Sequence, residues 1–495
     1  MRKIKVLEVN NIDLPGRVFN GYNMIRDLST KNLSIKQAVI YKQSNNNDVI
    51  KIIKTSEEMH LYEKLVDFEN NVSIHNLLSI TSPLLVRLKQ YKEADIIHFH
   101  MFHNTKLSIP SLIQISKEKK VIVTLHDPWF FTGRCVHFYD CNKWKNGCNN
   151  CNNLNNLFIF SEDNCNNLWN IKKETLKKSN IDFIVSSQWM MDLYKESPIF
   201  SNNNNVHLIS FGIDLEKYKD NNNKDEIREK FNIKNNDIVL FLRSQSEFKG
   251  TEFVVKALKN LNTIHSITIL TCGEKGLLDS LKNKYNVIDL GDIKENEVID
   301  AMNVCDMFIM PSKAESFGMM AVEAMACSRP VIIFNNTAMP SVTFAPECGV
   351  EVKNKDYIDL MEKIKFLIEN SEERIRRGKL GREYCEKNYS YDKYNQNLKN
   401  LYTKIYNRKN KTIKYHKNIN KKAYNTYLEK INNYIQTGQI DTTFCYSSPD
   451  YIDIINKVNE RLFIKYIKYS YKNRIRRILK KSKMICKIHN KIKGR

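Results

Sequence analysis

Short apolar runs alternate with amphipathic helical patterns through the first 370 residues, a pattern typical of parallel sheets covered by helices. In the first half of the chain the runs predict strands at 4–9, 35–41, 95–100, 121–125, 183–186 and 206–209. A second series predicts strands at 238–242, 266–272, 287–289, 306–310 and 331–334, with helices at 252–261, 295–302, 316–326 and 358–369. Near residues 212–236 the periodicity breaks. The pattern therefore predicts two α/β domains in series.

We place the domains at residues 1–212 and 213–402, the second ending in a closing helix, and predict a basic, mostly helical tail at 403–495. The chain has 495 residues, of which 42% are apolar and 27% charged. This is enough apolar material for more than one core and excludes a chain that is disordered throughout.

Charge changes this picture only at the C-terminal end. The formal net charge is +23, and residues 401–495 hold 24 Lys or Arg against 5 Asp or Glu. From Arg461 to Arg495 there are 14 basic residues and no acidic one, with an apolar stripe at helical spacing that includes Tyr471 and Ile475. We expect this segment to lie on an anionic membrane surface, where each cation contributes about 1 kcal/mol. Nucleic acid ranks lower because no recognised module accompanies the stripe, and a solvated tail is the other alternative.

No run of 18 apolar residues is present, so we expect no transmembrane helix. The segment from Met1 to Asn10 has a short apolar run that Glu8 interrupts, too short for a signal peptide. These features predict a cytoplasmic protein. Eight of the 12 cysteines are scattered, and in a reducing compartment they would be buried thiols.

The strongest chemical motif follows the predicted strand at 306–310. Glu315 stands at the strand-to-helix turn, and the N–H groups of Ser316, Phe317 and Gly318 would open a helix and receive a phosphate. Glu323 lies about 12 Å further along the helix axis. Two carboxylates that flank an anion-binding helix start could hold the two ends of a sugar nucleotide, Glu315 the sugar and Glu323 the ribose. A capping Glu and a surface Glu are the alternative.

A second motif follows the strand at 238–242. Arg243 ends that strand, and Lys249 with Gly250 comes just before a predicted helix. Both cations would therefore lie at the carboxyl edge of a parallel sheet, where open α/β folds bind ligands. There they could neutralise a diphosphate as its bond to the sugar breaks. Two solvated loop charges are the alternative.

Together with three further motifs, these residues resemble the GT-B glycosyltransferases of retaining family 4, the group 1 glycosyltransferases. The further motifs are Asp95-x-x-His98-x-His100, Thr124-x-His126-Asp127 and Phe211-Gly-Ile-Asp214. The resemblance covers roughly residues 1–402. It implies two Rossmann-like parallel-sheet domains that face a cleft, with the acceptor in the first domain and the donor in the second. It also implies transfer of a sugar from a nucleotide-diphosphate donor, with retained configuration and no catalytic metal.

The same resemblance implies individual roles. Arg243 and Lys249 match the pyrophosphate-contacting pair, although six positions separate them where five is common. Glu315 matches the donor-sugar contact and Glu323 the ribose contact. His126 matches a histidine that faces the reaction centre, which makes it a catalytic candidate with Glu315 and Lys249. Cleft and acceptor positions would fall on three residues: Gly16, His100 and Asp127. A loop histidine packed beneath Trp129 is the alternative for His126.

A cysteine-rich loop at 127–155 carries the remaining candidate site. Cys135, Cys141, Cys148 and Cys151 could hold a structural zinc ion, with free thiols or two disulfides as alternatives. The run from His126 to Cys135 resembles a subgroup tied to exopolysaccharide assembly. It implies work on capsule or lipopolysaccharide with a saccharide or polyprenyl-linked acceptor.

His98, His100 and His103 end a strand, where a metal site is conceivable, but polar groups that line the cleft are the preferred interpretation. Two other functions stay open. One is a GT-B-fold epimerase that acts on a nucleotide sugar without an acceptor. The other is a non-enzymatic membrane or nucleic-acid adaptor with a degenerate sugar site.

Overall fold

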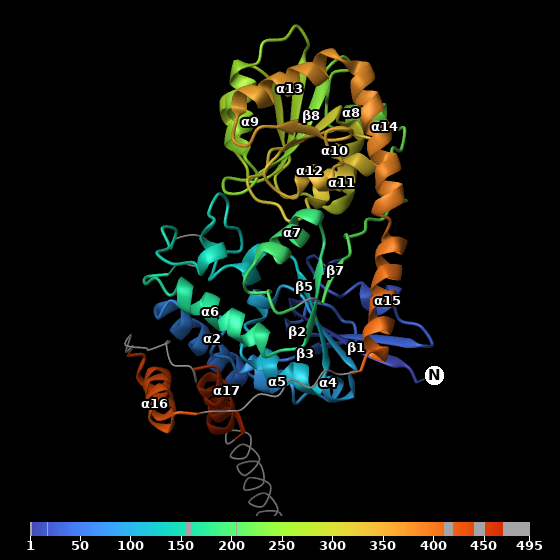
Figure 1. Ribbon diagram of the computed structural model, residues 1–495. Helices are drawn as coiled ribbons and strands as arrows, with labels where there is room; N and C mark the ends of the chain where they lie inside the picture. Colours follow the sequence, from blue (N-terminus) through green and yellow to red (C-terminus); the bar gives the residue numbers. More distant parts are fainter. Residues whose placement is uncertain are drawn as a thin grey trace, which may run out of the picture.

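The computed structural model describes residues 2–16, 18–154, 160–203, 205–409, 419–439 and 451–468. They form two domains, one above the other, each built on a parallel sheet (Figure 1). The predicted α/β class with two parallel-sheet domains is confirmed.

Seven parallel strands form the first sheet, in the order β3-β2-β1-β4-β5-β6-β7. They are β1 (Ile4–Ile12), β2 (Leu33–Tyr41), β3 (Val49–Lys51), β4 (Ile96–Phe99), β5 (Lys120–Leu125), β6 (Ile181–Val185) and β7 (Val206–Leu208). The helices between them are α1 (Met24–Asp27), α2 (Ser56–Asn71), α3 (Thr81–Leu85), α4 (Lys89–Glu93), α5 (Ser111–Glu118), α6 (Cys165–Lys177) and α7 (Gln188–Glu196). Three 3₁₀ turns complete the domain: η1 (Phe102–Thr105), η2 (Pro128–Phe131) and η3 (Lys143–Asn146).

Six parallel strands form the second sheet, in the order β10-β9-β8-β11-β12-β13. They are β8 (Ile238–Ser244), β9 (Ile267–Gly273), β10 (Asn286–Asp289), β11 (Met307–Met310), β12 (Val331–Phe334) and β13 (Val350–Val352). The helices are α8 (Lys224–Lys230), α9 (Thr251–Asn260), α10 (Glu295–Val304), α11 (Met319–Ala326), α12 (Met339–Val342), α13 (Tyr357–Glu369) and α14 (Ser371–Asn388), with η4 (Asp279–Leu281). The sheet orders place the carboxyl ends of β8 and β11 side by side, and this edge carries the predicted donor motifs.

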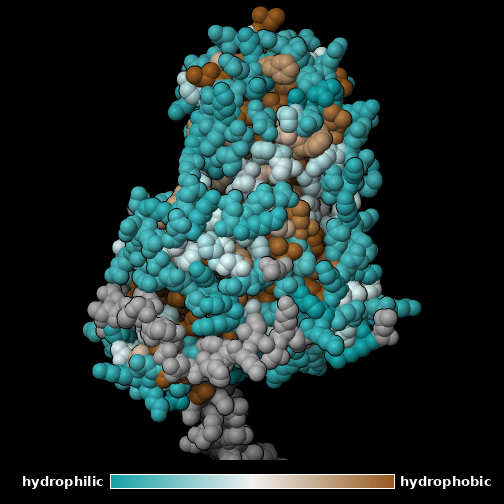
Figure 2. Space-filling view, viewed as in Figure 1, coloured by the Kyte–Doolittle hydropathy of each residue, from teal (hydrophilic) through white to brown (hydrophobic). Residues whose placement is uncertain are grey.

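Alternation along the strands divides the apolar side chains into separate cores, because successive residues point to opposite faces of a sheet. One core lies on one face of the first sheet, with Leu7, Ile97 and Val123. A second core lies on the other face of the first sheet and continues into the second domain; it includes Val6, Ile96 and Phe308. A third covers the outer side of the second sheet. On the surface shown in Figure 2, which is mostly hydrophilic, hydrophobic residues show between the two domains beside α15.

The segment expected to be a free tail from residue 403 instead belongs largely to the first domain. The helix α15 (Tyr391–Asn407) runs along this domain, and α16 (Lys421–Thr437), α17 (Tyr451–Leu462) and the π-helical η5 (Phe463–Lys468) pack below it (Figure 1). Ile431, Ile455 and Leu462 are fully buried in its core. The helical prediction is confirmed for these segments and the prediction of a tail is wrong there, because their apolar faces fill the core. Most of the basic stripe, including Tyr471 and Ile475, lies outside the described residues.

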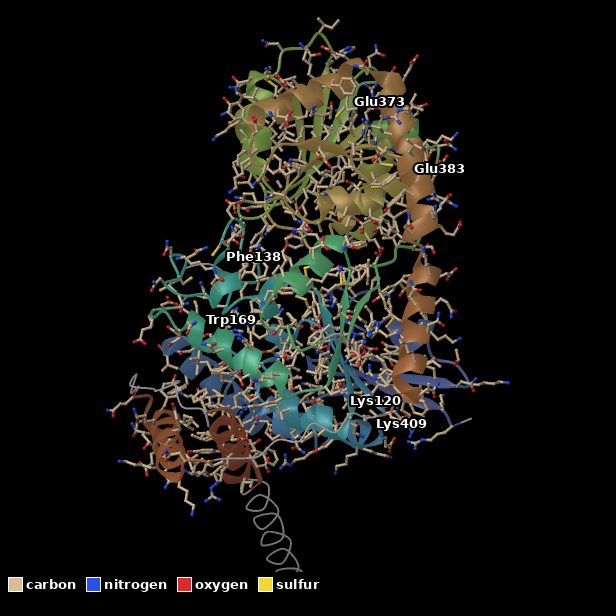
Figure 3. The ribbon with its side chains drawn as sticks, viewed as in Figure 1. Lys120, Phe138, Trp169, Glu373, Glu383 and Lys409 are labelled. Carbon is tan, nitrogen blue, oxygen red and sulfur yellow. The ribbon has the colours of Figure 1, made fainter. Side chains whose placement is uncertain are left out.

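Several contacts fasten α15 to the first domain at its far end. Lys120 donates to the carbonyl oxygen of Arg408, and the Arg408 guanidinium forms an ion pair with Asp182, with Nη1 2.9 Å from Oδ1. Lys120 and Lys409 lie together at the base of this domain, whereas Glu373 and Glu383 lie on α14 beside the second domain (Figure 3). The two consecutive helices therefore belong to different domains.

The chain passes between the domains twice, once after β7 and once between α14 and α15. The two passes touch at Ile213 and Ser390, which form a parallel bridge. The Ile213 N–H donates to the Tyr389 carbonyl oxygen at 2.8 Å, and the Tyr391 N–H donates to the Ile213 carbonyl oxygen at 2.9 Å. The connections are therefore hydrogen-bonded to each other.

Candidate active site

Two loops of the second domain bring the predicted donor residues together. Lys249 follows β8 and Glu315 follows β11, and their side chains form an ion pair between Nζ and Oε1. The pair is largely enclosed, because the side chains are only 18% and 12% exposed. Gly250 adopts φ +67, and a Cβ there would overlap the carbonyl oxygen of Pro311. Only glycine therefore allows the two loops to pack so closely.

The turn before α11 differs from the prediction in where the helix begins. The helix starts at Met319, not at Ser316, because Gly318 takes the left-handed φ of +86 as N-cap. Phe317 is buried, with its ring centroid 5.3 Å from that of Phe211 in the first domain. The N–H groups of Ser316 and Phe317 therefore belong to the turn and not to the first helical turn, which is a correction. The Ser316 hydroxyl is buried and has no hydrogen-bond partner among the described residues.

Glu323 lies on α11 at the edge of a cavity of about 260 Å³ between the domains. Burial raises its pKa to about 7, and the neighbouring Glu295 adds to the shift, while a hydrogen bond with Tyr218 and the charge of Arg243 oppose it. Phe19, from the loop of the first domain, also lines this cavity. Arg243 itself is exposed at the end of β8. The structure thus brings Glu323 and Arg243 near each other.

His126 comes from the first domain, directly after β5. Its ring stacks on Phe211 at a centroid distance of 5.4 Å, and its Nε2 lies 3.1 Å from Nδ1 of His100. Burial, followed by the charges of three nearby histidines, holds its pKa well below the usual range. The ring is therefore a neutral imidazole that is partly exposed, in contact with an aromatic residue that also meets Phe317 of the second domain.

Two predicted cleft residues have different positions from those expected. His100 is only 1% exposed and lies behind His126, so the prediction that it lines the cleft is wrong. Asp127 is 8% exposed and caps η2, its Oδ1 accepting from the Trp129 N–H at 2.9 Å. Gly16 is exposed, and its φ of +73 lies in the left-handed region that favours glycine.

Two residues that hold this histidine cluster have no signal in the sequence. Glu8 of β1 is fully buried and accepts from both His100 and the Tyr402 hydroxyl, at 2.7 Å each. Tyr402 comes from α15, 394 residues away in the chain. His98, also fully buried, contacts Tyr402 as well. An apolar run around Glu8 predicts only a strand, so the contact could not be found from periodicity.

The cysteine-rich loop reaches toward the second domain. Phe138 lies at the upper side of the first domain, above Trp169 of α6 (Figure 3). The rings of His137 and Tyr139 lie 5.5 and 6.4 Å from that of Phe248, next to Lys249. Burial chiefly lowers the pKa of His137, with Asp127 and Glu315 opposing and Lys249 adding to the shift. An ion pair between Asp140 and Lys355 also joins this loop to the second domain.

A buried lysine anchors the first turn of that loop. Lys172 of α6 is fully buried and donates to the carbonyl oxygens of Trp129 and Thr132 at 2.6 and 2.8 Å. Its Nζ also lies 3.6 Å from the centre of the Trp129 ring. Burial lowers its pKa to about 7. Lys172 therefore holds the segment between His126 and Cys135 in place.

The four predicted zinc ligands do not form a tetrahedral set. In the described part of the chain, no three of their sulfur atoms come within 4.8 Å of one another. Burial raises the pKa of Cys135 to about 11 and of Cys148 to about 12. Cys151 instead lies beside Cys165, which the sequence alone places among the scattered thiols, and both backbone N–H groups bond Asp163. This geometry does not fit a zinc ion, and zinc binding stays a prediction.

Two parallel-sheet domains in series are the architecture of the GT-B class of fold. Similar solved structures include HepE of Anabaena, in complex with UDP and glucose, at a TM-score of 0.57, 15% identity, and coverage of 81% of this chain and all of that one. A glycosyltransferase from Rickettsia africae matches at a TM-score of 0.58 and 15% identity, covering 83% of this chain and 100% of the other. At these identities the similarity shows the fold alone.

Residues 223–384 match the family model described as glycosyl transferases group 1. A protein of the Klebsiella pneumoniae cps region is 25% identical over 72% of this chain and 88% of its own length. The capsular polysaccharide biosynthesis glycosyltransferase CapM of Staphylococcus aureus is 25% identical over 72% and 97%. An uncharacterized glycosyltransferase of Methanocaldococcus jannaschii is 30% identical over 34% of this chain, and the match spans 48% of its own length. Residues 223–384 are therefore similar to the group 1 glycosyl transferases, the family that the motifs resemble.

Proposed function

We propose that this glycosyltransferase moves a sugar from a nucleotide-diphosphate donor to a saccharide or polyprenyl-linked saccharide, with retained configuration, in the assembly of a cell-surface polysaccharide. One observation carries the proposal: the enclosed pair of Lys249 and Glu315, at the sheet edge where β8 and β11 end. A cation and a carboxylate held side by side suit a diphosphate and the hydroxyls of the sugar attached to it.

In this arrangement the donor diphosphate lies against Lys249 and Arg243. Its departure with the bonding electrons builds negative charge, which the fixed cation and the N–H groups at the start of α11 stabilise. Glu315 accepts hydrogen bonds from the sugar, and Glu323 accepts them from the ribose. The acceptor hydroxyl attacks from the same face of the sugar and gives its proton to the leaving phosphate oxygen. The residues need no metal ion for these steps.

The comparisons support parts of this proposal. HepE binds UDP and glucose in the same fold. A relative from Campylobacter jejuni, 24% identical over 48% of this chain, is an N-acetylgalactosaminyltransferase whose acceptor is a diphospho-undecaprenol saccharide. The putative transferase WcaC of Escherichia coli serves colanic acid biosynthesis. We therefore place UDP-sugars and lipid-linked saccharides first among the substrates to test.

The deciding experiment titrates the full chain with UDP and GDP, with and without Mg²⁺, and then offers UDP-sugars with and without a polyprenyl-diphosphate saccharide. Micromolar binding without metal, followed by transfer that depends on the acceptor, is the expected result. Conversion of the donor alone into an isomer would identify an epimerase. Binding of neither nucleotide would favour an adaptor with a degenerate site.

Location at the cytoplasmic face of a membrane is part of the same proposal. Within the residues that the structure describes, no helix is both long enough and apolar enough to cross a bilayer. The +23 charge and the basic C-terminal segment support binding to anionic lipid. Truncation should begin after Lys468, because Phe463 and Ile467 are buried in the first domain. Loss of binding to anionic vesicles with retained fold is the expected result, and retained vesicle binding would contradict it.

Zinc quantification on protein purified without chelator belongs beside these assays. One equivalent of zinc that disappears when Cys148 and Cys151 are replaced by Ser would support a structural ion in the 127–155 loop. Zinc-free protein with four titratable thiols would contradict it.

A further inference from the structure

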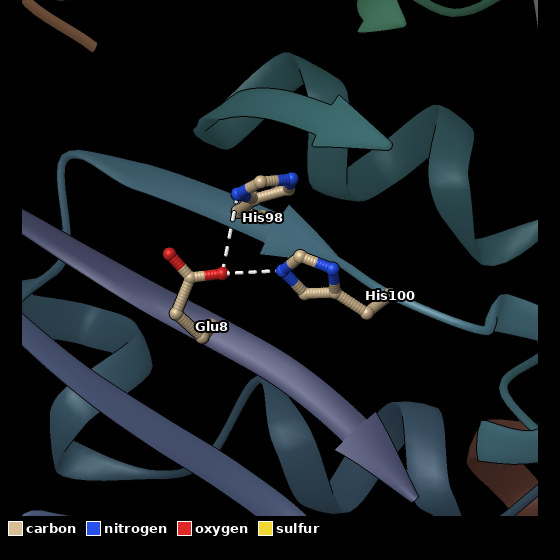
Figure 4. Close-up of side chains that lie close together, drawn as sticks. All are labelled: Glu8, His98 and His100. Carbon is tan, nitrogen blue, oxygen red and sulfur yellow. Dashed lines mark hydrogen bonds and ion pairs between the residues drawn. The ribbon is translucent and has the colours of Figure 1, made fainter. Parts of the chain in front are cut away.

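A continuous line of hydrogen bonds runs from the buried interior of the first domain to His126. Glu8 Oε2 lies 2.7 Å from His100 Nε2, and His100 Nδ1 lies 3.1 Å from His126 Nε2. Glu8 Oε1 accepts from the Tyr402 hydroxyl at 2.7 Å. Figure 4 shows Glu8 on one strand, with both His98 and His100 turned toward its carboxylate.

The elements that hold this line are the centre of the first sheet and α15. Glu8 and His98 are direct neighbours across β1 and β4, so their side chains share one face of the sheet. His98 is held on both sides, 2.7 Å from the Thr124 hydroxyl and 2.7 Å from the Tyr402 hydroxyl. Gly21 lacks a Cβ where one would come 2.8 Å from the Glu8 side chain. Glu8 therefore has a single, enclosed position.

The direction of the hydrogen bonds follows from the carboxylate. Burial alone would raise the pKa of Glu8, but the charge of His98 and the hydrogen bonds that both His98 and His100 make with the carboxylate outweigh it and lower the pKa to about 2. An ionised carboxylate only accepts, so the facing Nε2 of His100 carries the hydrogen. Burial lowers the pKa of His100 to about 4, so the ring is neutral and its Nδ1 accepts. The hydrogen between the two rings then belongs to His126 Nε2, and His126 Nδ1 is left as an acceptor.

Glu8, His98 and His100 also offer three ligand atoms within 4.8 Å, a spacing compatible with a metal ion. The detailed distances indicate hydrogen bonds instead. Two ligand atoms at about 2.1 Å from one ion, about 90–110° apart, would be separated by about 3.0–3.4 Å. Glu8 Oε2 and His100 Nε2 are closer, at 2.7 Å, and both nitrogens of His98 already have partners. The cluster is thus complete without an ion.

We propose that Glu8 and His100 are positioning residues that fix His126 as a neutral imidazole with Nδ1 accepting a hydrogen bond from a saccharide hydroxyl in the cleft. The proposal rests on the proposed function, because it assumes that a sugar binds against His126. A buried anion at one end fixes the polarity of both hydrogen bonds, and the ring cannot turn its donor toward the substrate without breaking them. The hydroxyl belongs either to the transferred sugar or to the acceptor.

The test replaces Glu8 by Gln, which keeps the size of the side chain and removes the charge. An amide both donates and accepts, so His100 can then reverse its hydrogen, and His126 with it. Full-length protein labelled with ¹⁵N-histidine reports the tautomer directly, and loss of a signal in His126→Asn assigns it. We expect a single Nε2–H tautomer at pH 7 in the wild type and a mixture or the Nδ1–H form in Glu8→Gln, with kcat about 10²-fold lower and unchanged UDP affinity.

A matched control is Glu69→Gln. Glu69 is another fully buried glutamate of the first domain, and it accepts from the backbone N–H groups of Asn76, Leu77 and Leu78. It should lower thermal stability without changing the His126 signals or the kcat of the remaining folded enzyme. This control separates loss of fold from loss of polarity.

Two results would overturn the proposal: a wild-type His126 that is protonated or in the Nδ1–H form at pH 7, or a folded Glu8→Gln with wild-type signals and kcat. Deoxy analogues separate the sources of the hydroxyl. If the hydroxyl belongs to the transferred sugar, only deoxy analogues of the donor substrate should react more slowly with the wild type, and this loss of rate should be smaller in Glu8→Gln. If the hydroxyl belongs to the acceptor, only deoxy analogues of the acceptor should show this loss and its reduction in Glu8→Gln. Failure of the proposed function would give a different result: the wild-type protein would show the Nε2–H tautomer of His126 but would neither bind nucleotide nor transfer sugar.

Discussion

Replacement of Lys249 by Met tests the donor site most directly. Met keeps most of the length of the lysine stem and removes only the charge, so packing of the loop after β8 is little affected. In the free protein Lys249 is paired with Glu315, and both side chains are less than one-fifth exposed. The variant therefore removes a charge from the diphosphate position and also leaves a largely enclosed carboxylate without its partner.

The expected size of the effect follows from this enclosure. Two unit charges about 4 Å apart attract by about 4 kcal/mol at the effective dielectric constant of about 20 that suits partly enclosed sites. In the proposed arrangement Arg243 and the start of α11 share the diphosphate charge, so we assign Lys249 about 2–3 kcal/mol of this attraction. At about 1.4 kcal/mol per factor of ten, this corresponds to a loss of about 10²-fold in UDP or GDP affinity and a loss of the same size in kcat/KM.

Calorimetry and transfer rates on three variants separate the two roles of the pair. Lys249→Met should lose nucleotide affinity and turnover. Glu315→Gln leaves the cation without its anionic partner, so nucleotide should bind at least as tightly while transfer falls. The double variant should recover thermal stability relative to Lys249→Met but not affinity. Nucleotide affinity within threefold of wild type in Lys249→Met, or an equal loss in Glu315→Gln, would refute this assignment.

Three further predictions concern the surroundings of this pair. Burial raises the pKa of Glu323 to about 7, and ribose hydroxyls donate to a carboxylate. UDP affinity should therefore fall up to tenfold per pH unit below pH 7, with a proton released on binding. Calorimetry in two buffers measures both effects and should find neither of them in Glu323→Gln. His137→Ala should raise the donor KM about tenfold with little change in thermal stability. The control Tyr139→Phe keeps its ring against Phe248 and should behave as wild type. An unchanged donor KM in His137→Ala would show that the loop does not reach the donor. Gly250→Ala puts a Cβ on a residue with left-handed backbone, directly against Pro311. The free energy of unfolding, measured by heat or urea, should fall by at least about 1–2 kcal/mol. An unfolding midpoint equal to that of the wild type would contradict the close packing of the two loops.

The strands of both sheets were predictable because buried parallel strands are continuous apolar runs, as in β12 (Val331–Phe334), where prediction and structure coincide. The three-residue strands β3 and β13 were missed, whereas β7, which is equally short, was predicted at 206–209. The start of α11 was misplaced by three residues, since nothing in the local pattern shows that Gly318 takes a positive φ.

Within the candidate site, the residues predicted were those that stand next to a strand end, such as Lys249 and Glu315. Their motifs are local in sequence. Tyr402, Glu8 and His137 were missed because their contacts join segments far apart in the chain, and no spacing rule reaches across such a distance. The sequence predicts a tail where α16 and α17 lie for a similar reason: their lysines are evident in the sequence, but the surface that buries their other faces is not.

The bridge between Ile213 and Ser390 limits how the two halves of the molecule can move. A single peptide linker allows bending in any direction, but two strands hydrogen-bonded side by side act as a hinge with one preferred axis, which runs near the bridge. Opening then becomes a rotation that the backbone angles of a few residues absorb, and sliding would break both hydrogen bonds. The amide hydrogens of Ile213 and Tyr391 should accordingly exchange slowly even while substrates enter and leave.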